Sequence, residues 1–389
     1  MKILIIEDDQ LVANIYRNKF AVEGFEAETA PNGEVGLELV QSFRPDAILL
    51  DLVLPNMSGL DVIRKIRTRL DSEKTPIIVF SNTYLSQMVQ DAWKAGATKC
   101  LSKSSSTPRI VIDAVRSAIK ANTSSPPADK PAVALKTQPV GGEEDEEFQA
   151  QLRDDFIADL PNTLVSLRTI LQALSRSDNE AARLKQIQEL YRQTHSLSSN
   201  AGIAGAADIA LLADALEALL KELQDKPKNI NVSTLRTVAS AVDFMGVLFD
   251  NVASPSRHLP PAEVLVVDDE AISRRAVTFA LEKAQMKSLA VEDPVKAVDF
   301  LTQKRFDLIF LDVDMPNMSG FELCTKIRTL PQYAKTPVVF VTGLNDLESR
   351  ANSTMSGGND FIAKPFLFIE LTLKALILVF RSRLLTAKK

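Results

Sequence analysis

The sequence predicts a multi-domain protein in which two α/β domains, each with a doubly wound parallel sheet, flank an all-α four-helix bundle. Residues near the two ends of the chain repeat one another at a constant separation of 261 positions. Both repeats alternate short apolar runs with helical patterns, whereas the block between them has helical periodicity only. We therefore expect the two ends to share one fold and the middle to have another.

The duplication is clearest at four chemically reactive positions. Around the second of them the first repeat reads LLDLVLPNMSG and the second reads FLDVDMPNMSG. Two acids, a hydroxyl and an amine recur in the same order and with the same spacings, with Asp8, Asp51, Ser81 and Lys103 becoming Asp269, Asp312, Thr342 and Lys364.

Each repeat opens with a short apolar run that ends in acids, and further buried strands are expected along it. The predicted strands are Ile3–Ile6, Ala47–Leu50 and Ile77–Phe80 in the first repeat and Val264–Val267, Leu308–Leu311 and Val338–Val341 in the second. Ligands of doubly wound sheets bind beyond the carboxyl ends of the strands. Since each reactive residue follows a strand, the four positions of a repeat should converge on one pocket.

Between the repeats, apolar residues recur at helical spacing. One stripe runs from Ile187 to Ala201 and another from Leu211 to Leu220. Breaks at Ser177-Asp178, Gly202–Gly205 and Lys226-Pro227 divide the block into about four helices. A helical bundle is the expected fold.

Two stretches of linker composition separate these blocks. Pro, Ser and Gly are frequent after Ala121 and again between Asn251 and Glu263. The acidic run Glu143–Glu147 fits either the first linker or the start of the first bundle helix. The predicted divisions are residues 1–121 for the first repeat, 122–146 for a flexible linker, 147–250 for the bundle, 251–261 for a second linker and 262–389 for the second repeat.

Composition limits the function classes. A net charge of -5 and a pI near 5.4 argue against a nucleic-acid-binding surface. The two cysteines, Cys100 and Cys324, provide neither a disulfide framework nor a zinc-site spacing, so we expect a cytoplasmic location. The amino terminus lacks the apolar run of a signal peptide, and we expect no stretch with the roughly 18 apolar residues of a membrane span.

The repeated residue types suit phosphoryl chemistry. Two acids after one strand and a third after another make the all-oxygen environment that Mg²⁺ prefers and that Mn²⁺ also accepts. A divalent cation beside a carboxylate would neutralise an approaching phosphoryl group. The aspartate could then attack phosphorus to give an aspartyl phosphate, while the lysine pairs with the phosphoryl oxygens and the hydroxyl donates to one of them.

Both repeats resemble the receiver domains of bacterial response regulators, which have a flavodoxin-like α/β fold. The matching motifs are IIEDD, LLDLVLPNMSG, VFSN and LSK in the first repeat and VVDDE, FLDVDMPNMSG, VFVTG and IAKPF in the second. The resemblance implies Mg-dependent self-phosphorylation of Asp51 and Asp312 from phosphohistidine donors. It also implies supporting roles for the hydroxyl residues Ser81 and Thr342, the lysines Lys103 and Lys364, and the metal-binding acids Glu7, Asp8, Asp51, Asp268, Asp269 and Asp312.

The two repeats differ at positions that matter for switching. Receivers often carry an aromatic switch residue three positions before the lysine; the second repeat has Phe361 there and the first has Cys100. Two positions beyond the acceptor stand Val53 and Asp314, and a carboxylate adds negative charge beside the phosphoryl group where valine does not. We therefore predict different phosphoryl lifetimes in the two repeats.

His195 lies on a predicted helix at the border of the apolar stripe, where one ring nitrogen is expected to stay open to solvent. The stretch THSLSSNAGIAGAADIALLADALEALL resembles the histidine phosphotransfer (HPt) domain, a four-helix bundle that carries a phosphoryl group on imidazole. The resemblance implies His195 as a third phosphoacceptor. Ser198 stands where the family often has lysine, so Arg192 is the candidate replacement cation, and Ser199 is small enough to let a receiver approach. The other histidine, His258, lies in a predicted linker and is given no role.

The predicted function is a two-component phosphorelay protein that passes phosphoryl groups between the receiver aspartates and His195. The sequence has no Gly-x-x-x-x-Gly-Lys-Ser/Thr loop and no Gly-rich kinase region, so we expect a phosphotransfer protein, not an enzyme with an ATP site, fed by a separate sensor histidine kinase. A downstream response regulator or effector is the expected recipient. Receivers often form homodimers through the face that contains their last helix, here Leu367–Leu385.

There are two alternatives, of which the first stays open. In the first, the receivers are phosphorylation-gated interaction surfaces of an adaptor and the bundle is a scaffold or dimerisation element. In the second, Asp312-Val313-Asp314 resembles the nucleophile motif of haloacid-dehalogenase-like phosphatases, although Val53 replaces the second acid in the first repeat. A His195→Gln protein that still moves phosphate between the receivers would favour the adaptor.

Overall fold

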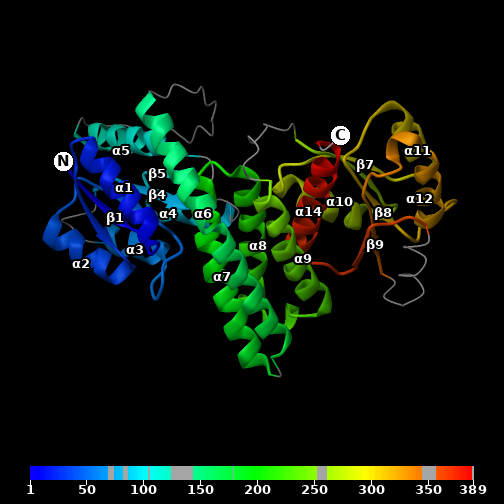
Figure 1. Cartoon of the computed structure of the whole chain (residues 1–389), viewed down its shortest axis with the longest axis horizontal. Helices are drawn as coiled ribbons and strands as arrows, with labels where there is room; N and C mark the ends of the chain where they lie inside the picture. The colour runs from blue at the N-terminus through cyan, green and yellow to red at the C-terminus, as the bar shows by residue number, and fades with distance from the viewer. Residues whose placement is uncertain are drawn as a thin grey trace. The chain divides into compact units, whose positions relative to one another are not determined.

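The computed structural model describes residues 1–68, 74–81, 86–103, 106–123, 143–177, 179–251, 261–343 and 356–387 (Figure 1). His258 and most of both predicted linkers lie outside the described residues. The chain forms two compact units, each with one five-stranded sheet and part of the central helical region. Unit 1 comprises Met1–Leu167, Tyr191–Asp214 and Asn251–Ser254, and unit 2 comprises Arg168–Leu190, Ala215–Asp250 and Pro255–Lys389.

In unit 1 the first repeat forms a parallel sheet in the order β2-β1-β3-β4-β5. The strand order reverses at β1, so the carboxyl ends of β1 and β3 border the crevice in which doubly wound proteins bind ligands. The strands are β1 (Lys2–Ile6), β2 (Glu26–Ala30), β3 (Ala47–Leu50), β4 (Ile77–Ser81) and β5 (Lys99–Ser102), and the helices are α1 (Gln10–Val22), α2 (Gly33–Phe43), α3 (Gly59–Arg67), α4 (Ser86–Ala95) and α5 (Pro108–Thr123).

Alternate residues of each strand enter two separate cores. On β1, Ile3 and Ile5 pack with the apolar residues of α1 and α5, whereas Leu4 and Ile6 pack with those of α2, α3 and α4. Successive strand side chains point to opposite faces of a sheet, so a sheet covered on both faces needs continuous apolar strands. This is why the predicted strands of the repeat read as uninterrupted apolar runs.

In unit 2 the second repeat forms the sheet β10-β9-β8-β6-β7, which, when read from its β7 edge, has the same strand order as the sheet of the first repeat. The predicted fold class is therefore confirmed: two parallel doubly wound sheets and a helical region between them in sequence. The strands are β6 (Glu263–Val267), β7 (Lys287–Val291), β8 (Leu308–Asp312), β9 (Val338–Thr342) and β10 (Asp360–Ala363), and the described helices are α10 (Ala271–Lys283), α11 (Pro294–Gln303), α12 (Gly320–Thr329), the 3-10 helix η2 (Pro331–Tyr333) and α14 (Phe368–Ala387).

The central region contains four long helices, separated at the three predicted breaks. They are α6 (Glu143–Ser175), α7 (Glu180–Ile203), α8 (Ala207–Asp225) and α9 (Val232–Phe249), with the 3-10 helix η1 (Pro227–Asn229) before α9. The acidic run left open by the sequence belongs to α6, which begins at Glu143 inside the predicted linker.

Among the described helices, α9 is long and apolar enough to cross a membrane by length and composition, with a mean hydropathy of 1.3 over 18 residues. The helix is not an unbroken apolar run, because it carries charged residues such as Arg236 and Asp243 within that length. In unit 2, α9 packs against α14 through both polar and aromatic contacts. Glu370 accepts hydrogen bonds from Ser233 at 2.6 Å and Thr237 at 3.1 Å, and the Arg381 guanidinium lies 5.5 Å from the Phe244 ring centre. These are the contacts of a helix that packs in a protein core.

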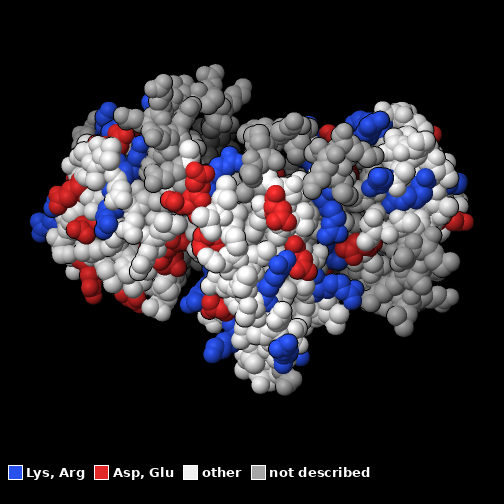
Figure 2. All heavy atoms as spheres, viewed as in Figure 1, with Lys and Arg blue, Asp and Glu red and all other residues white. Residues whose placement is uncertain are grey.

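Charged side chains of both signs are distributed over the face of the molecule shown in Figure 2, with uncharged residues between them. At the end of α8, for example, Lys221 pairs with Asp225 and Lys226 pairs with Glu222, both at 3.1 Å and four residues apart. Exposed pairs of this kind stabilise a helix by only about 0.3–0.5 kcal/mol each. These two pairs therefore contribute little to the stability of the fold.

Candidate functional site

The PNMSG motif builds the same turn in both repeats. Asn56 and Asn317 have φ values of 66° and 70°, in the left-handed region that Asn tolerates better than most residues. A Cβ on Gly59 would lie 2.2 Å from the carbonyl oxygen of the aspartate that precedes the turn, and one on Gly320 would lie 2.1 Å from its counterpart. Because only glycine permits this approach, the motif ends in Gly twice.

In the first repeat Lys103 joins two acids at the carboxyl end of the sheet. Its Nζ lies 2.5 Å from Oδ2 of Asp51 and 2.9 Å from Oε1 of Glu7. Lys103 is fully buried, and Asp51 and Glu7 are 1% and 4% exposed. Ser81, at the end of β4, is also buried and its carbonyl accepts from the Lys103 N–H at 3.2 Å. The four predicted positions of this repeat therefore lie at one end of the sheet.

Burial and pairing set the protonation of this group. Desolvation favours the neutral form of Asp51, but the Lys103 ammonium and the nearby His195 outweigh it, so the pKa of Asp51 is lowered. For Glu7, desolvation exceeds the attraction of Lys103 and raises its pKa to about 8. Desolvation lowers the pKa of Lys103, but the two carboxylates outweigh this effect and raise it. Asp51 is thus held as a carboxylate, the form that acts as a nucleophile.

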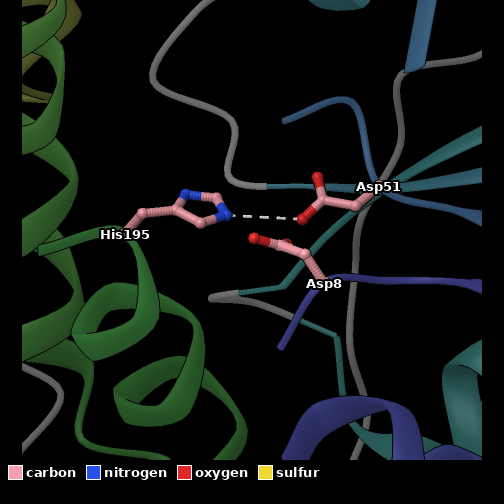
Figure 3. A group of neighbouring side chains, drawn as sticks. All are labelled: Asp8, Asp51 and His195. Atoms are coloured by element: carbon pink, nitrogen blue, oxygen red, sulfur yellow. Dashed lines mark ion pairs between the residues drawn. The ribbon is translucent and has the colours of Figure 1, made fainter. Parts of the chain in front are cut away.

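His195 of α7 reaches this carboxylate within unit 1. Its Nε2 lies 3.4 Å from Oδ2 of Asp51, and Figure 3 shows the imidazole pointing at that oxygen with Asp8 beside it. His195 is only 5% exposed. The Nε2 atom is buried, because α7 turns this edge of the imidazole toward the receiver.

Two further contacts between α7 and the first repeat were not predicted. Ser196 Oγ donates to Oδ2 of Asp9 at 2.7 Å. Ile203, the last residue of α7, is 4% exposed and belongs to the core cluster formed with α1 and α5. Asp9 is the third acid of the IIEDD motif, but its partner is 187 residues away, and no local pattern points to a contact at that separation.

Two serines that follow His195 on α7, Ser198 and Ser199, are buried. Ser198 is fully buried and donates a short hydrogen bond to Asp214 of α8, which is itself 4% exposed. Ser199 is also fully buried. Arg192 is exposed, and its service as a replacement cation remains a prediction. Ser198 is therefore used in joining α7 to α8.

In the second repeat the equivalent lysine is less enclosed. Lys364 Nζ lies 3.1 Å from Oδ2 of Asp268 and 3.0 Å from Oδ2 of Asp312, and 20% of its side chain is exposed. Desolvation raises the pKa of Asp312 although Lys364 opposes it. The pKa of Lys364 is raised because its hydrogen bonds to the two acids outweigh desolvation. Thr342 ends β9, and the placement of its side chain lies outside the description.

The acid that opens the second site has a different set of partners. Asp268 accepts from Ser273 Oγ at 2.5 Å and from the Glu270 N–H at 2.9 Å. The predicted switch residue, Phe361, lies on β10 and packs partly buried against the core below α11 and α12. Cys100 lies on β5 of the first repeat and is half-buried; desolvation raises the pKa of its thiol to about 12.

Acidic oxygens converge in both repeats in a way that fits a divalent cation. Atoms of Asp268, Asp269 and Asp312 all lie within 4.8 Å of one another, as do atoms of Asp8, Asp51 and His195. The group in the second repeat offers only oxygen ligands, which Mg²⁺ prefers. In the first repeat Asp8 and Asp51 offer oxygen ligands, and His195 of α7 adds a nitrogen.

Comparison with known families assigns these domains. The response regulator receiver domain matches residues 3–115 and 264–376, and the Hpt domain matches residues 151–243. The chain belongs to the response regulator receiver family. Receiver and Hpt domains are phosphotransfer signalling modules, not kinases, and together they make this a two-component phosphorelay protein. Receiver domains generally bind Mg²⁺ at an acidic pocket such as those described above.

Individual relatives match one receiver-sized segment. The probable transcriptional regulatory protein TcrX of Mycobacterium tuberculosis is 32% identical over 32% of this chain and 53% of its own length. Protein RcaC of Microchaete diplosiphon is 32% identical over 28% of this chain and 17% of its own length. The chemotaxis response regulator CheY4 of Vibrio cholerae is a solved structure with 33% identity and a TM-score of 0.29, covering 31% of this chain and 99% of CheY4. The matches therefore cover only part of this chain and only part of the first two relatives.

Proposed function

We propose that the first receiver and the HPt domain exchange a phosphoryl group directly, between Asp51 and His195 of the same chain. The observation that carries this proposal is the 3.4 Å separation of His195 Nε2 from Asp51 Oδ2 at the carboxyl end of a receiver sheet. A nucleophile and its acceptor must approach along one line for phosphoryl transfer, and Figure 3 shows the ring nitrogen aimed at the carboxylate.

The exchange is a balanced substitution at phosphorus. In one direction the neutral Nε2 of His195 attacks the phosphorus of an acyl phosphate on Asp51, the P–O bond to the carboxylate breaks and a P–N bond forms. The released carboxylate is stabilised by Lys103, whose ammonium already lies 2.5 Å from it. The reverse direction breaks the P–N bond and returns the group to Asp51. Neither direction consumes ATP.

The other side chains have supporting roles in the proposal. Mg²⁺ or Mn²⁺, held by Asp8 and Asp51 with Glu7 nearby, would neutralise charge on the phosphoryl oxygens. Lys103 and the Ser81 hydroxyl bind those oxygens. In the second receiver Asp312 is the acceptor, with Asp268 and Asp269 as metal ligands and Lys364, Thr342 and Phe361 in the binding and switching roles.

We infer the remaining assignments from the family and the described elements. The receivers extend over residues 1–121 and 262–389 and the HPt domain over about 147–250, with linkers 122–146 and 251–261 that keep the domains at high effective concentration. Phosphate enters from a separate sensor histidine kinase in the cytoplasm. It leaves to the second receiver, a downstream response regulator or an effector. Homodimerisation through the last helix remains a further prediction.

One observation favours the adaptor alternative. Ser198 replaces the usual lysine and is fully buried against Asp214, so this position supplies no cation to a phosphoryl group on His195. An HPt-like bundle without that cation would serve as a scaffold that holds receivers. The two readings differ in a single observable, which is whether His195 carries phosphate.

The decisive experiment loads the full chain with a radiolabelled acyl phosphate in the presence of Mg²⁺. We expect label in an acid-labile, base-stable phosphoramidate in the wild type and in His258→Gln, which removes the other histidine as a matched control. His195→Gln should abolish it, and Asp51→Asn should reduce it strongly. Label confined to the aspartates of the wild type would refute the exchange and support the adaptor.

A further inference from the structure

We infer that the hydrogen bond between Ser196 and Asp9 selects the first receiver as the partner of His195. This inference rests on the proposed exchange between Asp51 and His195. Neither residue touches the reacting atoms, so both are positioning residues. They would determine which of two similar receivers presents its aspartate to the imidazole.

The contact links the acceptor helix to a fixed point of the receiver. Asp9 caps α1: its Oδ1 accepts from the backbone N–H of Leu11 at 2.9 Å and of Val12 at 3.2 Å. Its Oδ2 is thereby left to accept from Ser196 Oγ at 2.7 Å. Ser196 adjoins His195 in sequence, and Asp9 follows the acids of the receiver site. The hydrogen bond therefore fixes the imidazole relative to the carboxylate.

A second contact on the same face of α7 fixes the orientation of this helix along the first receiver. Ser196 and Ile203 are seven residues apart, which places them on one face of an α-helix. Ile203 is 4% exposed and packs in the core cluster that contains Val12 of α1. A polar contact at one end and an apolar contact at the other leave α7 little freedom to slide along the receiver. Of the two, only the polar contact needs a particular acceptor atom.

The second receiver differs at this position. Glu270 corresponds to Asp9 but makes no side-chain cap at the start of α10. Its carboxylate lies 3.8 Å from Lys364 Nζ instead, toward the receiver's own site. A Ser196 hydroxyl approaching α10 as it approaches α1 would not meet the preplaced carboxylate oxygen that Asp9 provides.

The effect on transfer should be about tenfold. A hydrogen bond to a charged group is stronger than one between neutral groups, and a tenfold change in rate corresponds to about 1.4 kcal/mol. The Ser196→Ala chain should therefore transfer from Asp51 to His195 about tenfold more slowly. Transfer from Asp312 to His195 should change by less than about twofold, because the second receiver lacks the contact. This selectivity is a readout that general damage to α7 would not produce.

The test uses the full chain in two backgrounds, Asp312→Asn and Asp51→Asn, so that one receiver donates in each. Each chain is loaded with radiolabelled acyl phosphate and Mg²⁺. The rate of phosphohistidine formation is then divided by the level of phosphoaspartate. Ser196→Thr keeps the hydroxyl and should restore most of the rate. Ser175→Ala removes an exposed α6 serine that bonds only to its own helix, and it serves as the matched control.

Glu270→Asp provides a gain of function in the same assay. It should raise transfer from Asp312, whereas Asp9→Glu should lower transfer from Asp51. An equal loss in both backgrounds for Ser196→Ala, or no loss in either, would overturn the selection role while leaving the exchange itself intact. Absence of phosphohistidine from the two parent chains would instead overturn the exchange, and the selection role with it.

Discussion

Lys103 and Lys364 occupy the same position in the two receivers, yet their surroundings differ. Lys103 is fully buried, whereas 20% of the Lys364 side chain is exposed. The pKa of Asp51 is lowered by Lys103 and His195 against desolvation, while desolvation raises the pKa of Asp312. Identical residue types at identical spacing thus have different protonation behaviour. Neighbouring elements, here the α7 helix, therefore help to set the pKa of the acceptor carboxylate.

The receivers also differ in the polar contacts that they make with the helical region. In unit 1 the site end of the receiver meets α7, through Asp51 and Asp9. In unit 2 the last helix, α14, meets α9 through Glu370, whose counterpart in the first receiver is Arg109. The charge at this position is therefore reversed between the copies. The duplicated domains have therefore diverged in these contacts while keeping the same acceptor and lysine residue types.

The largest difference between the receivers should appear when the lysines are removed. Lys103→Met would leave Glu7 and Asp51 buried without their cation and should lower the free energy of unfolding by about 3 kcal/mol. Lys364→Met should cost about 1 kcal/mol, since solvent reaches that pair. Urea titration without Mg²⁺, followed by the fluorescence of the single tryptophan, Trp93 of α4, reports on the first receiver. Far-UV circular dichroism follows the helices and strands of all domains, so comparing it with the fluorescence separates unfolding of the first receiver from that of the rest of the chain. Equal costs would contradict the contrast in burial.

The glycines of the PNMSG motif should instead behave alike in the two copies. Gly59→Ala and Gly320→Ala each place a Cβ against a backbone carbonyl and should destabilise their domains by about 1–3 kcal/mol. Gly343→Ala is the control, because no atom lies within 4 Å of the added Cβ. Thermal unfolding of the full chain measures all three. A tolerated Gly59→Ala would show that the turn relaxes easily.

A smaller effect is expected where α14 meets α9. Glu370→Gln removes the charge that accepts from Ser233 and Thr237 and should destabilise unit 2 by about 1 kcal/mol. Arg109→Gln, at the same position of the first receiver, is exposed and should cost less than about 0.5 kcal/mol. Denaturant midpoints of the full chain compare the two. A larger loss for Arg109→Gln would show that the first receiver relies on this face as well.

The smallest effect concerns the lifetime of the aspartyl phosphates. Asp314 is exposed beside the second acceptor, and its carboxylate can accept a hydrogen bond from an attacking water, which Val53 cannot do. In a His195→Gln chain, Asp314→Val should therefore slow hydrolysis at Asp312 about threefold. Loss of label after removal of the phosphodonor measures the rate. The reciprocal Val53→Asp should accelerate loss of the phosphoryl group from Asp51. Unchanged hydrolysis rates in both variants would show that this position does not determine the phosphoryl lifetime.

Much of the fold could be predicted because it depends on local patterns. Strands covered on both faces need unbroken apolar runs, so β1 and β3 matched the predicted ranges to within a residue. Breaks such as Lys226-Pro227 likewise marked helix ends. The start of α6 was left open because an acidic run suits both a linker and a helix amino terminus.

The arrangement of the site was less predictable. Residue types and strand order indicated that Glu7, Asp51 and Lys103 would meet, and they do. The burial of His195 was missed, because helical periodicity places a side chain on a face but does not say what covers that face. The Ser196 contact was missed for the same reason: its partner comes from another domain, and spacing along one helix carries no information about it.

The burial of His195 implies that partner domains would have mutually exclusive access to its imidazole. Under the proposed exchange, an imidazole that is 5% exposed can meet one partner domain at a time, so any other phosphoryl donor or acceptor would reach it only after the first receiver has moved away. The observed rate of phosphoryl transfer with any other partner would then be its intrinsic rate multiplied by the fraction of time for which the imidazole is uncovered. A small change in that fraction would slow or speed every route through the histidine at once, without altering the chemistry of any of them.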